Sequence, residues 1–173
     1  MENLHLGLDI GGQSIKGIAL DGKGRVAGEY SLPTPAKDGA EAVLSAIGRT
    51  VEVLTGGKAV FSVGVGTPGG VDKEGRVVGM SANISGWYGT PLGERIRAMA
   101  GGAPTTVRND GNIAAYAEWA VRREKGKILL FIGLGTGSGG AMSWTGTSLG
   151  EGTTGPWRLA ILSLSRGEGN ASA

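Results

Sequence analysis

DIGGQSIKG at residues 9–17 and GLGTGSGGA at residues 133–141 are the stretches of this chain that say most about its fold. Each is a glycine-rich turn between two runs of strand-forming residues. Because glycine has no side chain, the backbone N–H groups of such a turn can wrap an anion. The pair Asn109-Asp110 lies between the two turns, at the expected start of a helix. A carboxylate between two phosphate-binding turns suggests phosphoryl transfer to a hydroxyl.

The composition is that of a globular protein with an excess of glycine. The chain has 173 residues and 35 glycines, about three times the usual share of roughly 7%. A net charge of +2 without a basic stripe gives nucleic-acid binding little support. The lack of cysteine excludes disulfides and Cys-ligated zinc. No apolar run approaches the roughly twenty residues of a membrane span, and no secretion signal precedes the first strand. We therefore expect a cytoplasmic protein without a membrane partner.

Hydrophobic periodicity predicts an α/β protein of two related lobes. Strands at 4–10, 15–21 and 25–32 should form an antiparallel meander. The helix that follows should take Asp38 as its N-cap and end at Gly56. The further expected elements are a strand at 59–66, a hairpin around Glu74-Gly75, a short helix at 91–99, a strand at 105–108, a helix at 111–123, and strands at 127–133 and 139–144. This alternation suits an α/β fold in which only the start of the second lobe is present.

The first glycine turn offers a cation site. Asp9 closes an apolar strand just before Gly11 and Gly12, where it could hold hydrated Mg²⁺ beside a bound phosphate. An ordinary hairpin corner explains this spacing equally well. Lys16 could neutralise phosphate charge, although a solvated strand residue is the simpler interpretation. Residues 17–23 match most of a Walker A pattern, but no Ser/Thr and no helix follow, so that interpretation is rejected.

Asp110 is the stronger catalytic candidate. It lies at or just before the N-terminus of the 111–123 helix, where the helix dipole favours a carboxylate. An ionised carboxylate there can take the proton of an attacking sugar hydroxyl as the phosphoryl group leaves ATP. A plain N-cap aspartate is the alternative and is the commoner case for such a residue in isolation. Asn109 can donate and accept hydrogen bonds with sugar hydroxyls.

Five motifs occur in series between about residue 4 and about residue 144. They are DIGGQSIKG, GVGTPGGVD, SANISGW, VRNDGNIAAYAE and GLGTGSGGA. Together they resemble the ROK family (repressors, open reading frames and kinases) of the sugar-kinase, Hsp70 and actin superfamily. The resemblance implies a ribonuclease-H-like/actin-like ATPase fold, ATP and Mg²⁺ as cofactors, and phosphorylation of a hexose or amino-hexose hydroxyl. It also implies that longer relatives are homodimers.

The resemblance assigns roles to particular residues. Asp110 would be the catalytic base, and Asn109 would help bind the sugar in a pocket that the loop of Gly69, Gly70 and Asn83 lines. The residues implied at the nucleotide phosphates are Asp9 (with Mg²⁺ through water), Gly11, Gly12, Gln13, Lys16, Gly135, Thr136 and Gly137. Gln13 replaces the family's usual threonine, although its amide can still donate a hydrogen bond. No helix-turn-helix precedes the first strand, which favours the kinase branch over the repressors.

The end of the chain departs from the family. The Glu-X-Gly-His sugar contact, the Cys-rich zinc loop and the adenine-binding helices are missing, so the family zinc site is absent from this sequence. We expect residues 1–108 to form the N-terminal lobe, 109–144 the start of the nucleotide-binding lobe, and 145–173 an aberrant tail. A frameshift would explain the tail, because shifted codons from Trp157 to Ile161 permit Glu-Ile-Gly-His.

Three functions remain open for such a chain. The first is a truncated and inactive sugar kinase, and the second is a non-catalytic sugar-binding or regulatory fragment. The third is a broken reading frame without a function of its own. A titration with ATP would separate the first from the other two.

Overall fold

The computed structural model describes residues 3–79, 81, 83–122, 128–134, 138–144 and 158–163. The chain divides into two units, Met1–Asp110 and Gly111–Ala173. The assignment of two lobes and a tail from the sequence stays a prediction. Within the described ranges, no helix combines the length and the apolar character that crossing a bilayer requires.

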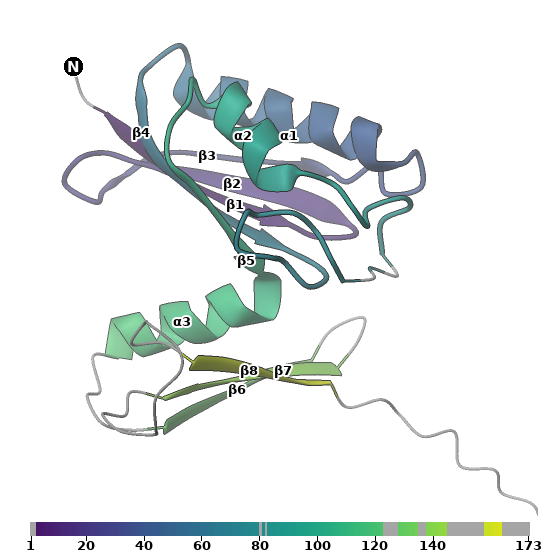
Figure 1. Ribbon diagram of the computed structural model, residues 1–173. Helices are drawn as coiled ribbons and strands as arrows, with labels where there is room; N and C mark the ends of the chain where they lie inside the picture. The colour runs from purple at the N-terminus through teal and green to yellow at the C-terminus, as the bar shows by residue number, and fades with distance from the viewer. Residues whose placement is uncertain are drawn as a thin grey trace, which may run out of the picture. The chain divides into compact units, whose positions relative to one another are not determined.

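A five-stranded sheet forms the centre of the first unit, in the order β3-β2-β1-β4-β5 (Figure 1). Its strands are β1 (Leu4–Ile10), β2 (Ser14–Leu20), β3 (Val26–Pro33), β4 (Val60–Thr67) and β5 (Thr105–Asn109). The pairs β1–β2 and β2–β3 are antiparallel, which confirms the predicted meander. Strand β4 lies parallel to both β1 and β5. The parallel strands therefore end at one edge of the sheet.

Two helices cover one face of this sheet, α1 (Ala40–Thr55) and α2 (Leu92–Met99), as Figure 1 shows. The apolar residues of α1 recur at helical spacing and are buried: Val43, Leu44, Ile47, Val51 and Leu54. The predicted N-cap Asp38 is wrong, because Gly39 occupies the N-cap position with φ 91° and no side chain caps the helix. The predicted end is confirmed by Gly56, which adopts the left-handed conformation that glycine tolerates.

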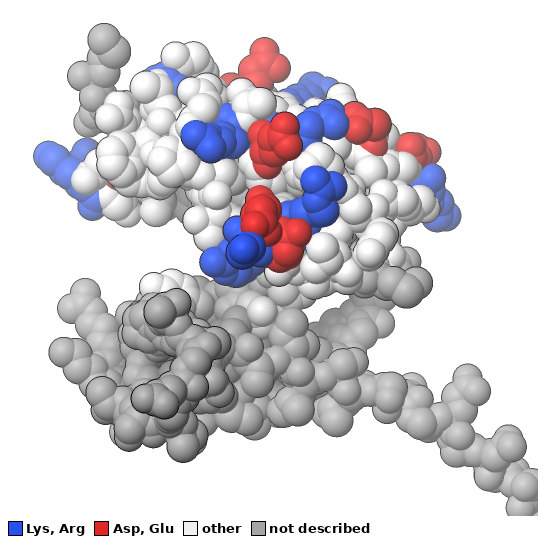
Figure 2. All heavy atoms as spheres, in the orientation of Figure 1, with Lys and Arg blue, Asp and Glu red and all other residues white. Residues whose placement is uncertain are grey.

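The helix-covered surface carries charges of both signs. Figure 2 shows acidic and basic side chains side by side on the visible face of the described residues. One such pair joins the two helices, because Arg95 donates to both carboxylate oxygens of Glu41, at 2.9 and 2.8 Å. This bidentate hydrogen bond holds the pKa of Glu41 below its ordinary value. Both side chains are solvated, so the pair adds little stability.

The helix α3 (Asp110–Arg122) begins at the boundary of the two units. The second unit contains an antiparallel sheet in the order β6-β7-β8. Its strands are β6 (Ile128–Leu134), β7 (Ser138–Trp144) and β8 (Arg158–Ser163). The first two confirm the predicted strands, whereas β8 lies in the stretch where the sequence showed no fold signal. The turn residues Gly135, Thr136 and Gly137 lie outside the described residues.

Candidate active site

The candidate site lies at the sheet edge where the parallel strands end. Asp9 of β1 is in register with Gly66 of β4, and Thr67 of β4 is in register with Asn109 of β5. Asp110 follows as the first residue of α3. Strand register thus brings Asp9 to the same sheet edge as the Asn109-Asp110 pair, although Asp9 and the pair lie about one hundred residues apart in the sequence. Ligands of α/β proteins bind at such carboxyl ends of parallel strands.

Gly66 lies next to both aspartates. A Cβ atom at this position would lie 3.6 Å from the Asp110 Cα and 3.8 Å from the Asp9 Oδ1. Any larger side chain would therefore enter the region that the two residues border. Sequence reasoning missed Gly66, although a glycine within a strand often marks the close approach of a ligand or of another backbone.

Asp9 is poised between opposing electrostatic effects. Asp9 is exposed to solvent as a residue. Its carboxylate is nevertheless partly desolvated, and this raises the pKa of Asp9. Lys16, its cross-strand neighbour on β2, lowers the pKa, and the negative charge of Asp110 raises it again. The net result is a pKa above the usual value, and partial desolvation is the largest cause.

The first glycine turn contacts the loop that carries Asn83. The Gly11 N–H donates to the Ser14 carbonyl at 2.9 Å and closes the turn. The Thr34 hydroxyl donates to the Gly11 carbonyl at 2.6 Å, which ties the turn to the end of β3. A Cβ atom at Gly12 would lie 2.7 Å from the Asn83 Cβ. The structure therefore brings a residue predicted at the phosphates next to one predicted at the sugar.

The loop at residues 67–70, which contains Gly69 and Gly70, is held by hydrogen bonds from two segments. The Asn109 amide donates to the Gly69 carbonyl at 3.1 Å. The Gly70 carbonyl accepts from the N–H groups of Val78 and Gly79, at 2.9 and 3.1 Å. A Cβ atom at Gly79 would collide with the Gly70 backbone, so the two segments can pack this closely only without a side chain there. Gly69 and Gly70 thus lie in a braced turn beside Asn109.

The structure therefore gathers most of the residues that the sequence singled out. Asp9, Asn109 and Asp110 lie at one sheet edge, the Gly69-Gly70 turn is bonded to Asn109, and Asn83 lies against Gly12. Gln13 and Lys16 are exposed at the β1–β2 hairpin. Thr67 and Trp87 were not predicted as site residues from the sequence. Both are buried, and they are hydrogen-bonded to each other. The tryptophan of SANISGW was the available signal, since a buried indole N–H usually needs an acceptor.

A divalent cation fits this donor set in one particular way. Among the described residues, no three His, Cys, Asp or Glu side chains cluster closely enough to hold a metal ion by themselves. Mg²⁺ is commonly held by one or two carboxylates together with water and substrate phosphates. Among the described residues, the exposed Asp9 carboxylate at the end of β1 is the candidate for that role.

Comparison with known proteins shows the family to which the chain belongs. The profile of the ROK family matches residues 5–156. The chain belongs to the ROK family, and its fold is the actin-like ATPase fold of the sugar kinases in that family.

Two curated relatives are a glucokinase and an amino-sugar kinase. The chain is 36% identical to the glucokinase of Streptomyces coelicolor over 140 residues, which are 80% of this chain and 43% of that protein. It is 30% identical to the N-acetylmannosamine kinase of Salmonella paratyphi A over 145 residues, 83% of this chain and 48% of that protein. The chain thus spans less than half the length of these relatives.

A solved structure agrees with these matches. The ROK glucokinase of Streptomyces griseus, in complex with glucose and AMPPNP, superposes with a TM-score of 0.69 at 34% identity. The superposition covers 81% of this chain and 44% of that one. The shared fold therefore occurs in a kinase that binds both a hexose and an ATP analogue.

Proposed function

We propose that this chain carries the sugar-binding and proton-accepting part of an ATP-dependent hexose or amino-hexose kinase. The observation that carries the proposal is the placement of Asn109 and Asp110 at the end of β5, with Asn109 bonded to Gly69 and with Asp9 across Gly66. The names of the relatives, glucokinase and N-acetylmannosamine kinase, support the substrate class.

In the proposed reaction, the sugar lies against the Gly69-Gly70 turn, Asn83 and Asn109. The Asn109 amide nitrogen donates to the Gly69 carbonyl, and an asparagine side chain can both donate to and accept from a sugar hydroxyl. The Asp110 carboxylate takes the proton of the attacking hydroxyl while the sugar oxygen bonds to the terminal phosphorus of ATP. The bond from that phosphorus to the bridging oxygen breaks, so the products are a sugar phosphate and ADP.

The phosphates would lie along the first turn. The Gly12 backbone N–H, the Gln13 amide and Lys16 offer donors and positive charge there, while the Gly11 N–H closes the turn. Gly135, Thr136 and Gly137 of the second turn are proposed to bind phosphate in the same manner. Asp9 would hold Mg²⁺ through water, and the bound ion would neutralise charge on the phosphates.

Sugar binding by the chain tests the first half of this proposal. Titration with glucose and with N-acetylmannosamine, followed by calorimetry, should show binding of at least one of them. Asn109→Ala should weaken that binding by about tenfold or more, because it removes hydrogen bonds to the sugar and to Gly69. Asp110→Asn should leave affinity nearly unchanged, since the amide has similar size and can still hydrogen-bond. Equal loss in both variants would contradict the separate roles.

Turnover tests the second half. Residues 1–144 would replace the matching part of the Streptomyces coelicolor glucokinase, and ADP formation would be measured with each sugar. Asp110→Asn in this chimera should lower kcat by at least about 10²–10⁴-fold, as expected for loss of a general base. Turnover close to that of the parent chimera would contradict the role of Asp110. Binding of sugar by the chain, together with a chimera that consumes no ATP, would favour a sugar-binding fragment.

A further inference from the structure

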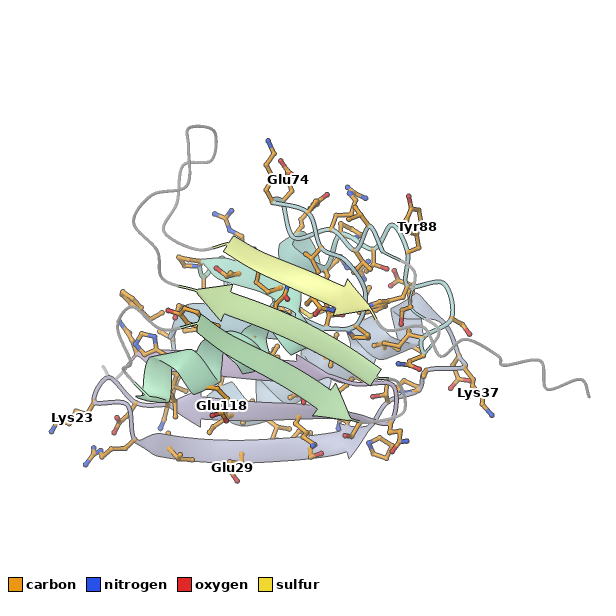
Figure 3. The ribbon with its side chains drawn as sticks, turned by 90° about the horizontal axis from the view of Figure 1, so that it is seen from below. Lys23, Glu29, Lys37, Glu74, Tyr88 and Glu118 are labelled. Carbon is orange, nitrogen blue, oxygen red and sulfur yellow. The ribbon has the colours of Figure 1, made fainter. Side chains whose placement is uncertain are left out.

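Trp87 is buried and bonded to the first residue of the 67–70 loop, although it belongs to an irregular segment. Its indole N–H donates to the Thr67 hydroxyl at 2.9 Å. The two residues are 1% and 0% exposed, so water does not compete for this hydrogen bond. The neighbouring Tyr88 is 68% exposed and points away from the molecule in Figure 3. The segment thus buries one of two adjacent aromatic rings, the one whose N–H has a protein acceptor.

Thr67 stands at the base of the loop that the proposed sugar site uses. It is the last residue of β4, it is in register with Asn109, and it precedes Pro68. Its hydroxyl faces the Pro68 carbonyl at 3.4 Å. The Thr67 side chain therefore connects the indole to the first peptide of the loop, one residue before Gly69.

The segment around Trp87 holds the same loop by a second route. The Gly89 N–H donates to the Val77 carbonyl at 2.8 Å, and the Val77 N–H donates to the Thr90 carbonyl at 3.0 Å. The residues after Val77 donate in turn to the Gly70 carbonyl. Both routes lead from the Trp87 segment to the two ends of the 67–70 loop.

We propose that Trp87 is a positioning residue for the sugar site, which acts by holding the Thr67 hydroxyl and with it the 67–70 loop against Asn109. The inference rests on the proposed function for its effect on sugar binding. Its structural half, the bracing of the loop by one buried hydrogen bond, is independent of that function. A buried indole N–H usually needs an acceptor, so the experiment must separate the bracing of the loop from the simple pairing of that N–H.

The test removes the acceptor and keeps its shape. Thr67→Val deletes the hydroxyl, Thr67→Ser restores it, and Thr50→Val is the matched control. Thr50 is also 0% exposed, and its hydroxyl donates to the Ala46 carbonyl within α1 at 3.0 Å. Amide hydrogen exchange at Val78 and Gly79 reports the loop, because their N–H groups bond to Gly70. Calorimetric titration with glucose and with N-acetylmannosamine reports the site.

Thr67→Val should speed exchange at Val78 and Gly79 by about tenfold and weaken sugar binding by a similar factor, as for loss of one buried hydrogen bond. Thr67→Ser should stay within about twofold of the wild type in both measurements, as expected when the hydrogen bond is kept. Thr50→Val should leave exchange at these amides, relative to the rest of the unit, and sugar affinity unchanged. The NMR resonance of the Trp87 indole N–H, assigned with Trp87→Phe, should shift in Thr67→Val only.

Wild-type exchange in Thr67→Val would overturn the positioning role. Faster exchange in Thr67→Val with unchanged sugar affinity would also overturn it, because the braced loop would then not matter to the site. A wild-type chain that binds neither sugar would count against the proposed function. In that case, faster exchange in Thr67→Val would still support the bracing of the loop by Trp87.

Discussion

Two hairpin turns of the first unit share one local design and differ in what surrounds them. The turns are DGKGR, from Asp21 to Arg25, and DKEGR, from Asp72 to Arg76. In each, the aspartate Oδ1 accepts the N–H groups of the residues two and four positions later. In each, the glycine has positive φ, 76° at Gly24 and 82° at Gly75.

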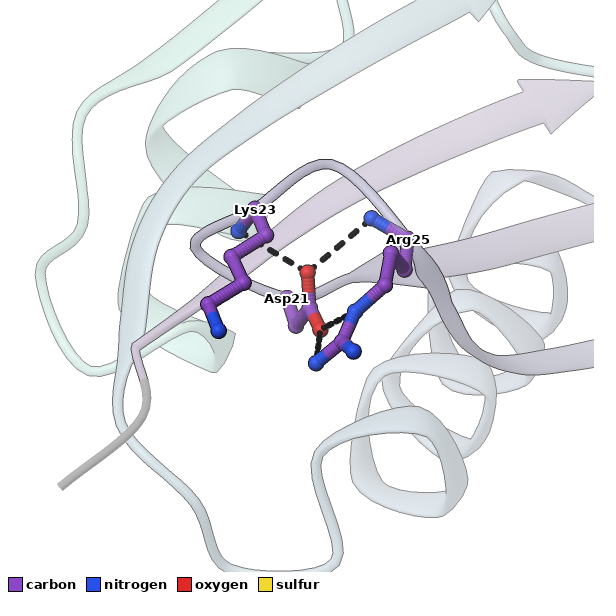
Figure 4. A network of polar contacts seen from close by, with 3 residues as sticks. All are labelled: Asp21, Lys23 and Arg25. Carbon is purple, nitrogen blue, oxygen red and sulfur yellow. Dashed lines mark hydrogen bonds and ion pairs between the residues drawn. The ribbon is translucent and has the colours of Figure 1, made fainter.

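The arginines of the two turns have different partners. Arg25 binds back to its own turn, since its Nε and Nη2 each lie 2.7 Å from the Asp21 Oδ2 (Figure 4). Arg76 instead donates to the Gly89 carbonyl at 2.8 Å, in the segment that carries Trp87. A short sequence thus determines the backbone of a turn, while the fold determines what its long side chain binds.

The largest expected difference concerns the two glycines. Gly24→Ala should cost about 1–2 kcal/mol, the penalty of a left-handed backbone for alanine. Gly75→Ala should cost that amount plus about 1–3 kcal/mol for overpacking, because its Cβ would lie 3.2 Å from the Gly93 Cα, whereas that of Gly24 meets open space. Urea unfolding would measure both changes. Equal costs would contradict the close contact between Gly75 and Gly93 of α2.

A smaller effect should follow from removing the arginines. Arg76→Ala should destabilise the fold by about 1 kcal/mol through the lost hydrogen bond, and should speed amide exchange at Val77 and Gly89, whose segment it ties down. Arg25→Ala is the control, because it removes the side-chain contacts to Asp21 within the 21–25 turn. Hydrogen exchange measured by mass spectrometry would distinguish them. Faster exchange around Gly89 in Arg25→Ala would contradict the prediction that only the arginine at position 76 stabilises the Gly89 segment.

The stability of the fold should depend on pH through Asp21 of the first of these turns. Hydrogen bonds from the Arg25 backbone N–H and from its side chain, and then from the Lys23 N–H, hold the pKa of Asp21 below its usual value. This carboxylate therefore stabilises the fold at pH values above the usual aspartate pKa, and that stabilisation is lost as the pH falls through the lowered value. Asp21→Asn should be less stable than the wild type at neutral pH, and the difference should vanish in acid. A pH-independent difference would contradict this origin.

The smallest expected effect has the opposite sign and concerns Asp9. Partial burial raises the pKa of Asp9, Lys16 lowers it, and Asp110 raises it. Because the folded pKa lies above the unfolded one, the unfolding free energy falls as the pH rises between the two values. Asp9→Asn should therefore be slightly more stable than the wild type at neutral pH, by less than about 1 kcal/mol because water screens the exposed carboxylate. Thermal unfolding at pH 4 and pH 7 would check this, with a clear loss of stability contradicting it.

Local pattern was sufficient for much of the fold. The meander, α1 and the later strands follow from the alternating or helical spacing of apolar residues, which is a property of residues close together in the sequence. The same reasoning placed Asp9 at the end of a strand and Asp110 at the start of a helix. It failed at the start of α1, where Asp38 and Gly39 both suit an N-cap and the backbone conformation of Gly39 decided between them.

The sequence by itself thus determined the order of the elements, the glycine turn at residues 9–17 and the polar residues at the strand ends. Only the tertiary structure decided that β4 pairs with β1, which places Asp9 beside Gly66. It also decided that Trp87 binds Thr67 and that Arg76 binds Gly89. Each of these contacts joins residues that lie well apart in the chain. Periodicity describes the neighbours of a residue along one element, whereas such contacts depend on how the elements pack.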